Sequence, residues 1–428
     1  MAEQDENTPH VQARFFTKQT VHSVPDTPFS VPASVGIKEL SSLINGLLKT
    51  GEEDGQLSFD FLVAGEFLRA SLQEHMLDRD IPTESVVEIE YLEKHPAPKP
   101  VDSLLHDDWV ACLQANGQYI LSGCYDNTVK LWKLSGENIL TIPSHSAPVK
   151  CVAWMRTETD GPLHHFLTGS HDQTVLLWQW DATSNSTQCL NVCRGHGGSV
   201  DCVGVNNANT KFATGSWDSM LKVWSAEPSA DQSEDHQTKS SKRKKTDGST
   251  VPTKVPLVTL SGHNEGISSV QWMDDVVVCT ASWDHTIKLW DMEQVANKAT
   301  ITGSKVFLDL SYSPISGFIV AASADRHVRL YDPRVTDGAV VKSTFTSHNA
   351  WVAGVCWSPS NENQFISGAY DNILKLWDIR SPKAPLYDMG GHEDKILAVD
   401  WSVPEFMLSG GADNSLKIFK YTQRGANT

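Results

Sequence analysis

The sequence predicts an all-β fold of seven repeated sheet units, preceded by a small α+β domain. Two observations lead to this prediction. A short phrase, LSGCYDNTVKLW at residues 121–132, recurs seven times up to residue 419, and each copy has an Asp six positions before an aromatic residue. Residues 11–97 lack the phrase and show a different order of extended and helical patterns. The chain is therefore expected to contain two kinds of domain.

The repeated phrase predicts a strand, a turn centred on the Asp, and a second strand. The second strand alternates, as in Val129-Lys130-Leu131-Trp132, which is the period of two that marks a sheet. A His followed four residues later by Val or Ile lies upstream of six copies. Successive Asp residues are 46, 46, 66, 41, 46 and 42 positions apart. The Asp–aromatic pairs are Asp126/Trp132, Asp172/Trp178, Asp218/Trp224, Asp284/Trp290, Asp325/Tyr331, Asp371/Trp377 and Asp413/Phe419.

These features resemble the WD40 family, whose motif is most complete at Gly262-His263 and Trp290-Asp291. The resemblance implies a seven-bladed β-propeller, a ring of four-stranded sheets over residues 98–422. The stretch Val101–Leu105 is expected to be the outer strand of the last blade, which closes the ring and removes a free sheet edge. Residues 1–10 are expected to be disordered, and residues 423–428 to form a tail.

The resemblance also implies that the His, Asp and Trp residues are structural rather than catalytic. In WD40 blades the Asp accepts from the main chain and the His, the His reaches a Ser or Thr, and that hydroxyl meets the Trp N–H. The fifth blade instead has Gly303, Ala321 and Tyr331, and the seventh ends in Phe419, so both are expected to be softer. The complete sets are His145, Thr168, Asp172 and Trp178; His196, Thr214, Asp218 and Trp224; His263, Thr280, Asp284 and Trp290; and His348, Ser367, Asp371 and Trp377.

Residues 11–97 predict a compact α+β domain with one amphipathic helix at about Ile37–Leu48. Its order of elements resembles ubiquitin. The domain has no terminal Gly-Gly, so conjugation to other proteins is excluded and a recognition role remains. Pro96, Pro98 and Pro100 predict a short, stiff linker to the repeats. The expected strands are Val11–Thr17, Phe29–Val31, Phe59–Val63, Phe67–Leu68 and Val86–Leu92, with a short turn at Ser71–Met76 before the last one.

The phrases RFFT and FDFLVAGEFLRASL, followed by a propeller, resemble the family with a Notchless-like amino-terminal domain. The resemblance implies a nuclear protein of the nucleolus and nucleoplasm that matures the large ribosomal subunit and its rRNA. The implied partners are pescadillo and the block-of-proliferation protein in the PeBoW complex, the pre-ribosomal large subunit, and the AAA ATPase midasin. The residue that corresponds to the acid offered to midasin's metal ion is Glu84, with Glu88 and Glu90 as competitors. A hard Mg²⁺ can take one such carboxylate oxygen at an open position.

The long spacing between Asp218 and Asp284 is due to an insertion at residues 226–256, which is rich in Ser, Thr, Asp and Lys and has no apolar periodicity. This composition predicts a disordered loop between the third and fourth blades. The basic run Lys242-Arg243-Lys244-Lys245 indicates a nuclear import signal or a nucleic-acid contact, unless the loop is merely solvated. Because the net charge of the chain is −17, a local import signal fits better than a broad RNA-binding face.

The residue before each Asp is expected to point toward the propeller face that carries the Asp turns. Four of these seven residues are large aromatics, Tyr125, Trp217, Trp283 and Tyr370. Tyr and Trp dominate binding hot spots, so these residues are candidate anchors for protein partners. The alternative is that they only pack on neighbouring turns.

Other classes of function receive little support from the sequence. We expect no enzyme and no cofactor, because the chain has no G-x4-G-K-[ST], H-E-x-x-H or G-x-S-x-G motif. The eight cysteines form no C-x2-C pair and are expected to be reduced core thiols. The chain has no run of eighteen apolar residues, so no membrane span is expected. The remaining alternative is a substrate adaptor of a ubiquitin ligase or a proteasome shuttle, although no F-box-like segment precedes the repeats.

Overall fold

The computed structural model describes residues 9–48, 57–82, 85–155, 161–227, 251–335 and 341–422. The chain divides into two compact units, Met1–Ala97 with Thr422–Thr428, and Pro98–Tyr421. Neither described helix has the length and apolar character that crossing a membrane requires.

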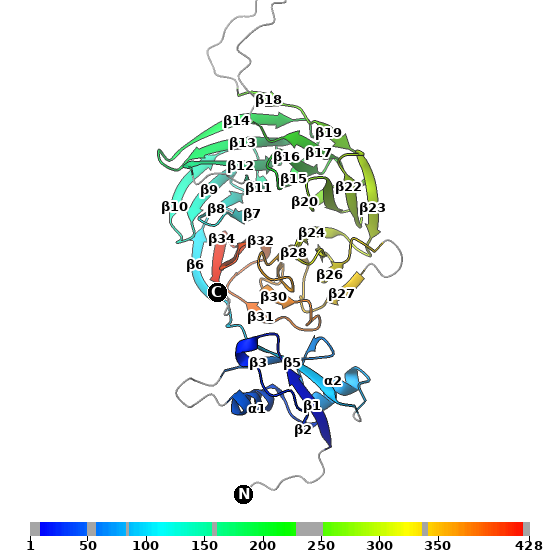
Figure 1. The fold of residues 1–428 in the computed structure, drawn as a ribbon. Coiled ribbons are helices and arrows are strands. Elements are labelled where there is room, and N and C mark those ends of the chain that lie inside the picture. The colour runs from blue at the N-terminus through cyan, green and yellow to red at the C-terminus, as the bar shows by residue number, and fades with distance from the viewer. Residues whose placement is uncertain are drawn as a thin grey trace, which may run out of the picture. The chain divides into compact units, whose positions relative to one another are not determined.

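The N-terminal unit is a five-stranded mixed sheet with a helix packed on it (Figure 1). The strand order is β2-β1-β5-β3-β4, and the central pair β1 and β5 runs parallel, with Ala13 opposite Val87. A short 3-10 turn spans Thr20–His22. The elements are β1 (His10–Phe16), β2 (Phe29–Pro32), α1 (Ile37–Leu48), β3 (Phe59–Val63), β4 (Glu66–Phe67), α2 (Leu72–Asp78) and β5 (Val87–Glu93). This arrangement agrees with the predicted order of elements to within one or two residues at each end.

The helices of this unit follow from the local sequence. Leu40 and Ile44 of α1 are buried one turn apart, as the apolar periodicity predicts. The expected turn at Ser71–Met76 is a helix that continues to Asp78. It begins after Ser71, whose side chain caps the first turn by accepting from the Glu74 main-chain N–H at 3.3 Å.

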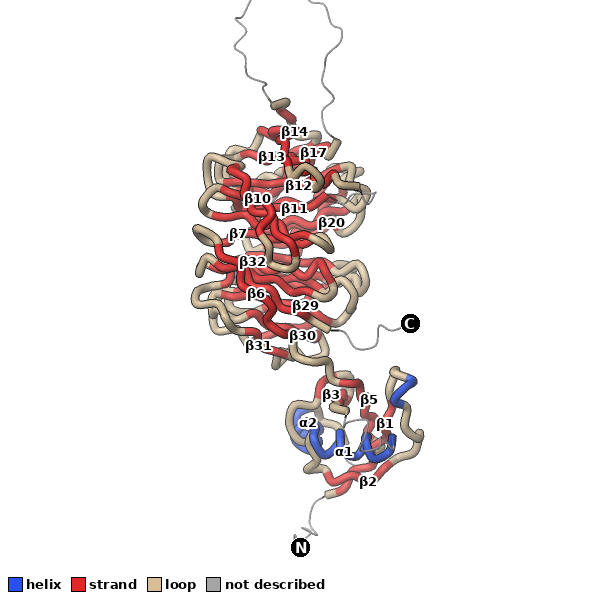
Figure 2. Tube along the Cα trace, turned by 90° about the vertical axis from the view of Figure 1, so that its left-hand side faces the viewer, coloured by secondary structure: helices blue, strands red, loops and turns tan. Residues whose placement is uncertain are grey.

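The C-terminal unit is a propeller of seven sheets arranged in a ring, with loops on both faces (Figures 1 and 2). Blade 1 contains β7 (Val110–Ala115), β8 (Tyr119–Cys124), β9 (Thr128–Lys133) and β10 (Asn138–Pro143); blade 2 contains β11 (Val149–Met155), β12 (Leu163–Ser170), β13 (Thr174–Asp181) and β14 (Ser186–Arg194); blade 3 contains β15 (Val200–Val205), β16 (Lys211–Ser216), β17 (Leu221–Ser225) and β19 (Val258–Leu260); blade 4 contains β20 (Ile267–Trp272), β21 (Val277–Ser282), β22 (Thr286–Asp291) and β23 (Ala296–Thr302). Blade 5 contains β24 (Phe307–Tyr312), β25 (Ile319–Ser323), β26 (Val328–Tyr331) and β27 (Val341–Phe345); blade 6 contains β28 (Val352–Trp357), β29 (Gln364–Ala369), β30 (Leu374–Asp378) and β31 (Tyr387–Met389); blade 7 contains β32 (Ile396–Val403), β33 (Phe406–Gly411) and β34 (Ser415–Lys420). The prediction of seven blades is confirmed.

The ring is closed by a strand from the other end of the unit. Strand β6 (Lys99–Leu105) pairs antiparallel with β34, with Leu104 opposite Leu416, and completes blade 7 as its outer strand. The closing strand predicted at Val101–Leu105 is therefore confirmed, and it begins two residues earlier.

Neighbouring blades approach closely at one small residue of the repeated phrase, which is Gly in five copies and Ala in the other two, at Ala281 and Ala322. A Cβ added at Gly215 would lie 2.4 Å from the Cγ2 atom of Ile267 in the next blade. The Gly of the repeated phrase therefore leaves room for an apolar side chain of the adjacent inner strand.

The prediction of a disordered loop over 226–256 between the third and fourth blades is wrong in its boundary and in its place. Thr253–Lys254 form β18, which pairs parallel with β14 and gives blade 2 a fifth strand. The insertion lies between β17 and β19, which are the third and fourth strands of blade 3, because the outer strand of this blade follows the insertion instead of preceding it. The Lys254 ammonium is mostly buried and donates to the main-chain oxygens of Ser225, at 2.8 Å, and of Glu227. These contacts hold the two ends of the insertion together, which a composition argument does not reveal.

Candidate functional site

The polar side chains of the WD40 pattern form a directed chain of hydrogen bonds in blade 3. His196 Nδ1 lies 2.9 Å from the Asp218 carboxylate, and His196 Nε2 lies 2.8 Å from the Thr214 hydroxyl. The Trp224 indole N–H donates to the same hydroxyl at 2.8 Å. Because a carboxylate only accepts, His196 Nδ1 carries a proton, and in the neutral ring Nε2 then accepts from the Thr214 hydroxyl.

Blades 2, 4 and 6 repeat this arrangement. In each blade the His contacts both the Asp and the hydroxyl, and the Trp donates to that hydroxyl. The sets are His145, Thr168, Asp172 and Trp178; His263, Thr280, Asp284 and Trp290; and His348, Ser367, Asp371 and Trp377. The structure thus brings together all sixteen side chains that the sequence grouped into four sets.

These groups are occupied by one another rather than poised for chemistry. Burial alone would raise the pKa of Asp218, but the hydrogen bonds from His196 and from the Gly197 main chain lower it to about 2. Asp284 behaves in the same way, with a pKa of about 2. Both carboxylates are therefore ionised acceptors, and the His side chains are enclosed. Such a network rigidifies a blade and leaves no free nucleophile or base.

Three blades depart from the pattern. In blade 7 the His392 contacts to Asp413 and Ser409 are kept, and Phe419 has no N–H to add. In blade 5 the role of the His passes to Arg329, which donates twice to Asp325 at 3.1 and 2.5 Å.

Blade 1 also departs from the pattern, although its sequence contains a His, a Ser, an Asp and a Trp at the expected positions. His106 Nε2 lies 2.8 Å from the Ser122 hydroxyl, but His106 Nδ1 faces the Leu104 main-chain oxygen at 3.3 Å rather than an Asp. Burial and the nearby Lys130 charge lower the pKa of His106 to about 4. His106 is therefore a neutral, buried ring without a carboxylate hydrogen bond.

The loops beside the Asp turns form a second recurring arrangement, which we call the Asp-turn face. In every blade the residue before the Asp donates its main-chain N–H to the carbonyl of the residue just before the inner strand. These pairs are Tyr125 and Trp109, His171 and Pro148, Trp217 and Ser199, Trp283 and Gly266, Ala324 and Val306, Tyr370 and Trp351, and Ala412 and Lys395. This main-chain bond places the residue just before each inner strand beside the residue that precedes the Asp, which in four blades is a predicted anchor.

The four predicted anchors lie on this face, in contact with other aromatic rings. Trp217 and Trp283 are 5.3 Å apart between ring centroids, and 46% of Trp217 is exposed. Tyr370, 36% exposed, stacks on Trp351 at 5.9 Å. Tyr125 lies 5.3 Å from Trp109. The rings therefore pack on neighbouring loops, as the alternative interpretation held, and still present apolar surface to solvent.

The sequence reasoning missed Trp109 and Trp351, as well as two lysines that join the aromatic rings. Lys395 Nζ lies 5.0 Å from the Trp109 ring centroid and 5.3 Å from that of Tyr370. Lys150 Nζ donates to the Tyr125 hydroxyl at 3.0 Å. The signal for the two Trp residues was their position just before the Val that follows each His by four residues.

The aromatic and cationic residues border a hollow of about 390 Å³ on the Asp-turn face. Asp201 lies in the same hollow, and its carboxylate accepts from the Trp217 indole N–H at 2.5 Å. The face therefore offers broad aromatic area with a few charged groups among the rings, a composition typical of protein-binding surfaces.

Five predicted site residues, Glu84, Lys242, Arg243, Lys244 and Lys245, lie outside the described part of the chain. Among the described residues there is no cluster of three His, Cys, Asp or Glu side chains that could hold a metal ion. All eight cysteines are free thiols. Burial raises the pKa of the Cys112 thiol to about 12, so this thiol stays protonated.

Comparison with known proteins assigns both units. Residues 11–76 match the NLE (NUC135) domain. The WD domain, G-beta repeat, matches seven times, at residues 98–133, 136–179, 187–225, 254–291, 297–332, 339–378 and 383–420. Among curated proteins, the chain is similar to the ribosome biogenesis protein WDR12 homolog of Ixodes scapularis, with 52% identity over 97% of this chain and 99% of the relative. The homologs of Aedes aegypti and Drosophila erecta are 50% and 49% identical, each over 96% of this chain and 95% of the relative.

Proposed function

Because the chain belongs to the WDR12 family of ribosome biogenesis proteins, we propose that it is a non-enzymatic scaffold in the assembly of the large ribosomal subunit. The observation that carries the proposal is the full-length similarity, which includes both the N-terminal domain and all seven blades. In this role the protein acts in the nucleolus and nucleoplasm during rRNA maturation. The relatives' shared description favours this role over that of a ubiquitin ligase adaptor or proteasome shuttle.

The propeller is proposed to dock in the PeBoW complex, with pescadillo and the block-of-proliferation protein, through the Asp-turn face. Trp217, Trp351 and Tyr370 are exposed, and Trp283 is half-buried beside Trp217. Together these rings supply the apolar area that such docking buries. Lys395, which lies over two of these rings, could pair with a partner's acidic group at the edge of the contact.

The N-terminal domain is proposed to be the handle for midasin. Glu84 would offer one carboxylate oxygen to the metal ion of that ATPase, since a metal held with an open position binds a single hard oxygen ligand well. The basic run Lys242–Lys245 is proposed as the nuclear import signal. In the sequence the run belongs to the insertion between β17 and β19 of blade 3.

The proposal is tested by pull-down from nuclear extract with matched variants of the full chain. Glu84→Ala should lose midasin and keep pescadillo and the block-of-proliferation protein, whereas Glu88→Ala, an exposed acid on β5, should keep all three. Trp217→Ala combined with Trp283→Ala should lose the PeBoW partners, whereas Leu105→Ala, 73% exposed on β6, should not.

Sedimentation of the same extracts decides the broader role. The unaltered protein should travel with large-subunit precursors. Co-purification with proteasomes in place of these precursors would contradict the scaffold role and favour the adaptor alternative. If the double Trp variant retained all partners, the proposed docking face would be wrong, but the scaffold role would not be contradicted.

A further inference from the structure

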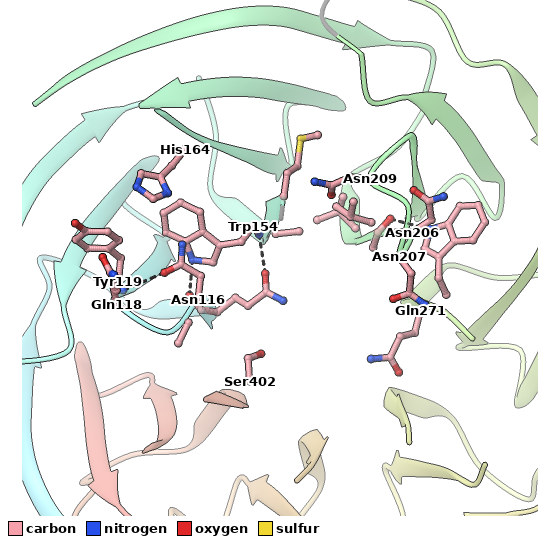
Figure 3. Close-up of a pocket in the computed structure, with 18 of the residues that line it drawn as sticks. Asn116, Gln118, Tyr119, Trp154, His164, Asn206, Asn207, Asn209, Gln271 and Ser402 are labelled. Atoms are coloured by element: carbon pink, nitrogen blue, oxygen red, sulfur yellow. Dashed lines mark hydrogen bonds between the residues drawn. The ribbon is translucent and has the colours of Figure 1, made fainter. Parts of the chain in front are cut away.

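The propeller face opposite the Asp turns contains a large hollow that the proposed function does not use. It is formed by the turns between first and second strands, mainly in blades 1 to 4, and has a volume of about 1200 Å³ (Figure 3). Carboxamide side chains surround it, including Gln114, Asn116, Gln118, Asn206, Asn207 and Gln271. None of its described lining residues is Lys, Arg, Asp or Glu. The described part of the lining is therefore free of these charged side chains, although the net charge of the chain is −17.

The hollow lies where a recurring contact between blades is interrupted. At five of the seven joints, a side chain near the end of one inner strand accepts from the main-chain N–H of the equivalent strand in the next blade. The acceptors and N–H donors are Gln114 and Trp154 at 2.7 Å, Gln271 and Tyr312 at 2.5 Å, Ser311 and Trp357 at 3.1 Å, Cys356 and Trp401 at 3.3 Å, and Asp400 and Ala115 at 2.9 Å.

At the other two joints the acceptor position is occupied by Ala153 and by Gly204, whose side chains cannot accept a hydrogen bond. The corresponding donors are the main-chain N–H groups of Val205 and Trp272. All four residues line the hollow. The small side chains therefore do two things at once: they open the space, and they leave two adjacent inner strands without the side-chain acceptor that the other blades receive.

We propose that this amide-lined hollow binds an extended, uncharged peptide segment of a partner protein through the main chain of that segment. Each peptide group has one donor and one acceptor, which is also what an Asn or Gln side chain offers. Carbonyl oxygens of the segment would accept from the N–H groups of Val205 and Trp272, and the carboxamides of Gln118 and Asn207 would pair with its remaining amides. The Asn206 carboxamide is already engaged with Thr210, Lys211 and Asp275 and serves only as part of the wall. Tyr119 and Trp154, at the edge of the hollow in Figure 3, supply apolar surface for its side chains.

Single-stranded RNA could also use amides and aromatic rings, but its phosphates require cations. The described lining residues provide no Lys or Arg. The observations thus favour a peptide. The lining includes none of the four aromatic anchors of the Asp-turn face.

Two variants of the full chain test the proposal. Ala153→Gln copies the residue that stands at the same position in blades 1 and 4, and it should supply the missing acceptor and fill the space. Asn207→Ala removes an exposed carboxamide of the rim and disturbs no buried group. Asn138→Ala, at an exposed position on the outer strand β10, is the matched control.

The probes are a phage-displayed library of short random peptides and a fluorescent oligouridine. We expect the unaltered protein to enrich peptides poor in charged residues, and the Kd of a synthetic enriched peptide to stay constant between about 0.05 and 0.5 M NaCl. That Kd should rise about tenfold or more with Ala153→Gln and severalfold with Asn207→Ala, and stay unchanged with Asn138→Ala. Equal binding by all variants, a charged and salt-sensitive consensus, or preferential binding of oligouridine would each overturn the proposal.

Discussion

Replacing Thr214 by Val tests whether the Thr214 hydroxyl links His196 and Trp224 in blade 3. The hydroxyl donates to His196 Nε2 and accepts from the Trp224 indole N–H. Valine has the same shape and neither function, so it leaves two buried groups unpaired. Each such group costs about 1–3 kcal/mol, and we therefore expect the variant to be destabilised by about 2–6 kcal/mol. Thr214→Ser keeps both hydrogen bonds and removes one buried methyl group, which costs about 1 kcal/mol.

The measurement is hydrogen exchange of the full-length protein, read by mass spectrometry at strands β16 and β17. This local measurement is preferable to a melting curve because a ring of repeats need not unfold in one step. A loss of 2 kcal/mol corresponds to an increase in exchange of about thirtyfold. The Val variant should show it in blade 3 and the Ser variant should not. Equal protection of the two variants would refute the assigned network.

Three further predictions concern single buried groups. Burial raises the pKa of Asp400 to about 6, from 3.8, so the native state loses about 3 kcal/mol as pH rises through this range; Asp400→Asn, which still accepts from the Ala115 N–H, should raise the Tm at pH 7.5 and not at pH 3. The buried Tyr331 hydroxyl has no partner among the described residues, so Tyr331→Phe should stabilise blade 5 by about 1 kcal/mol in urea unfolding. Burial, followed by the Lys130 charge, lowers the pKa of His106 to about 4, from 6.5; protection of blade 1 in hydrogen exchange should therefore be full above pH 6.5 and decline as pH falls toward 4.

The repeated frame was predictable because its signals are local. The fixed offset from Asp to aromatic, the upstream His and the period of two lie within about fifty residues of one another and recur seven times. The blades, the closing strand and the four complete polar sets all follow from this pattern. The parts that were not predicted depend on distant residues. Strand β18 has only two residues, Thr253–Lys254, and no periodicity of its own; it exists because β14 offers an unpaired edge to it.

The candidate sites show the same limit. Tyr125, Trp217, Trp283 and Tyr370 could be chosen from the sequence because one position of the repeat varies toward aromatics. Their neighbour Trp351 occupies another position of the repeat, and only the main-chain bond between the two loops places it beside Tyr370. The interrupted joints at Ala153 and Gly204 were still less visible, since a missing acceptor has meaning only after the next blade is in place.

The proposed sites lie at the positions of the repeat where the blades differ from one another. The positions that hold the polar network carry no information about partners, because in blades 2, 3, 4 and 6 the same His, Asp and Trp serve the same structural purpose. Specific recognition must therefore come from positions where the blades differ. On the Asp-turn face the difference is an excess of aromatic rings, and on the opposite face it is the absence of two acceptors among seven. The variant Ala153→Gln, which gives blade 2 the residue found at this position in blades 1 and 4, should therefore weaken peptide binding in the hollow. It should leave the binding of the PeBoW partners at the Asp-turn face unchanged.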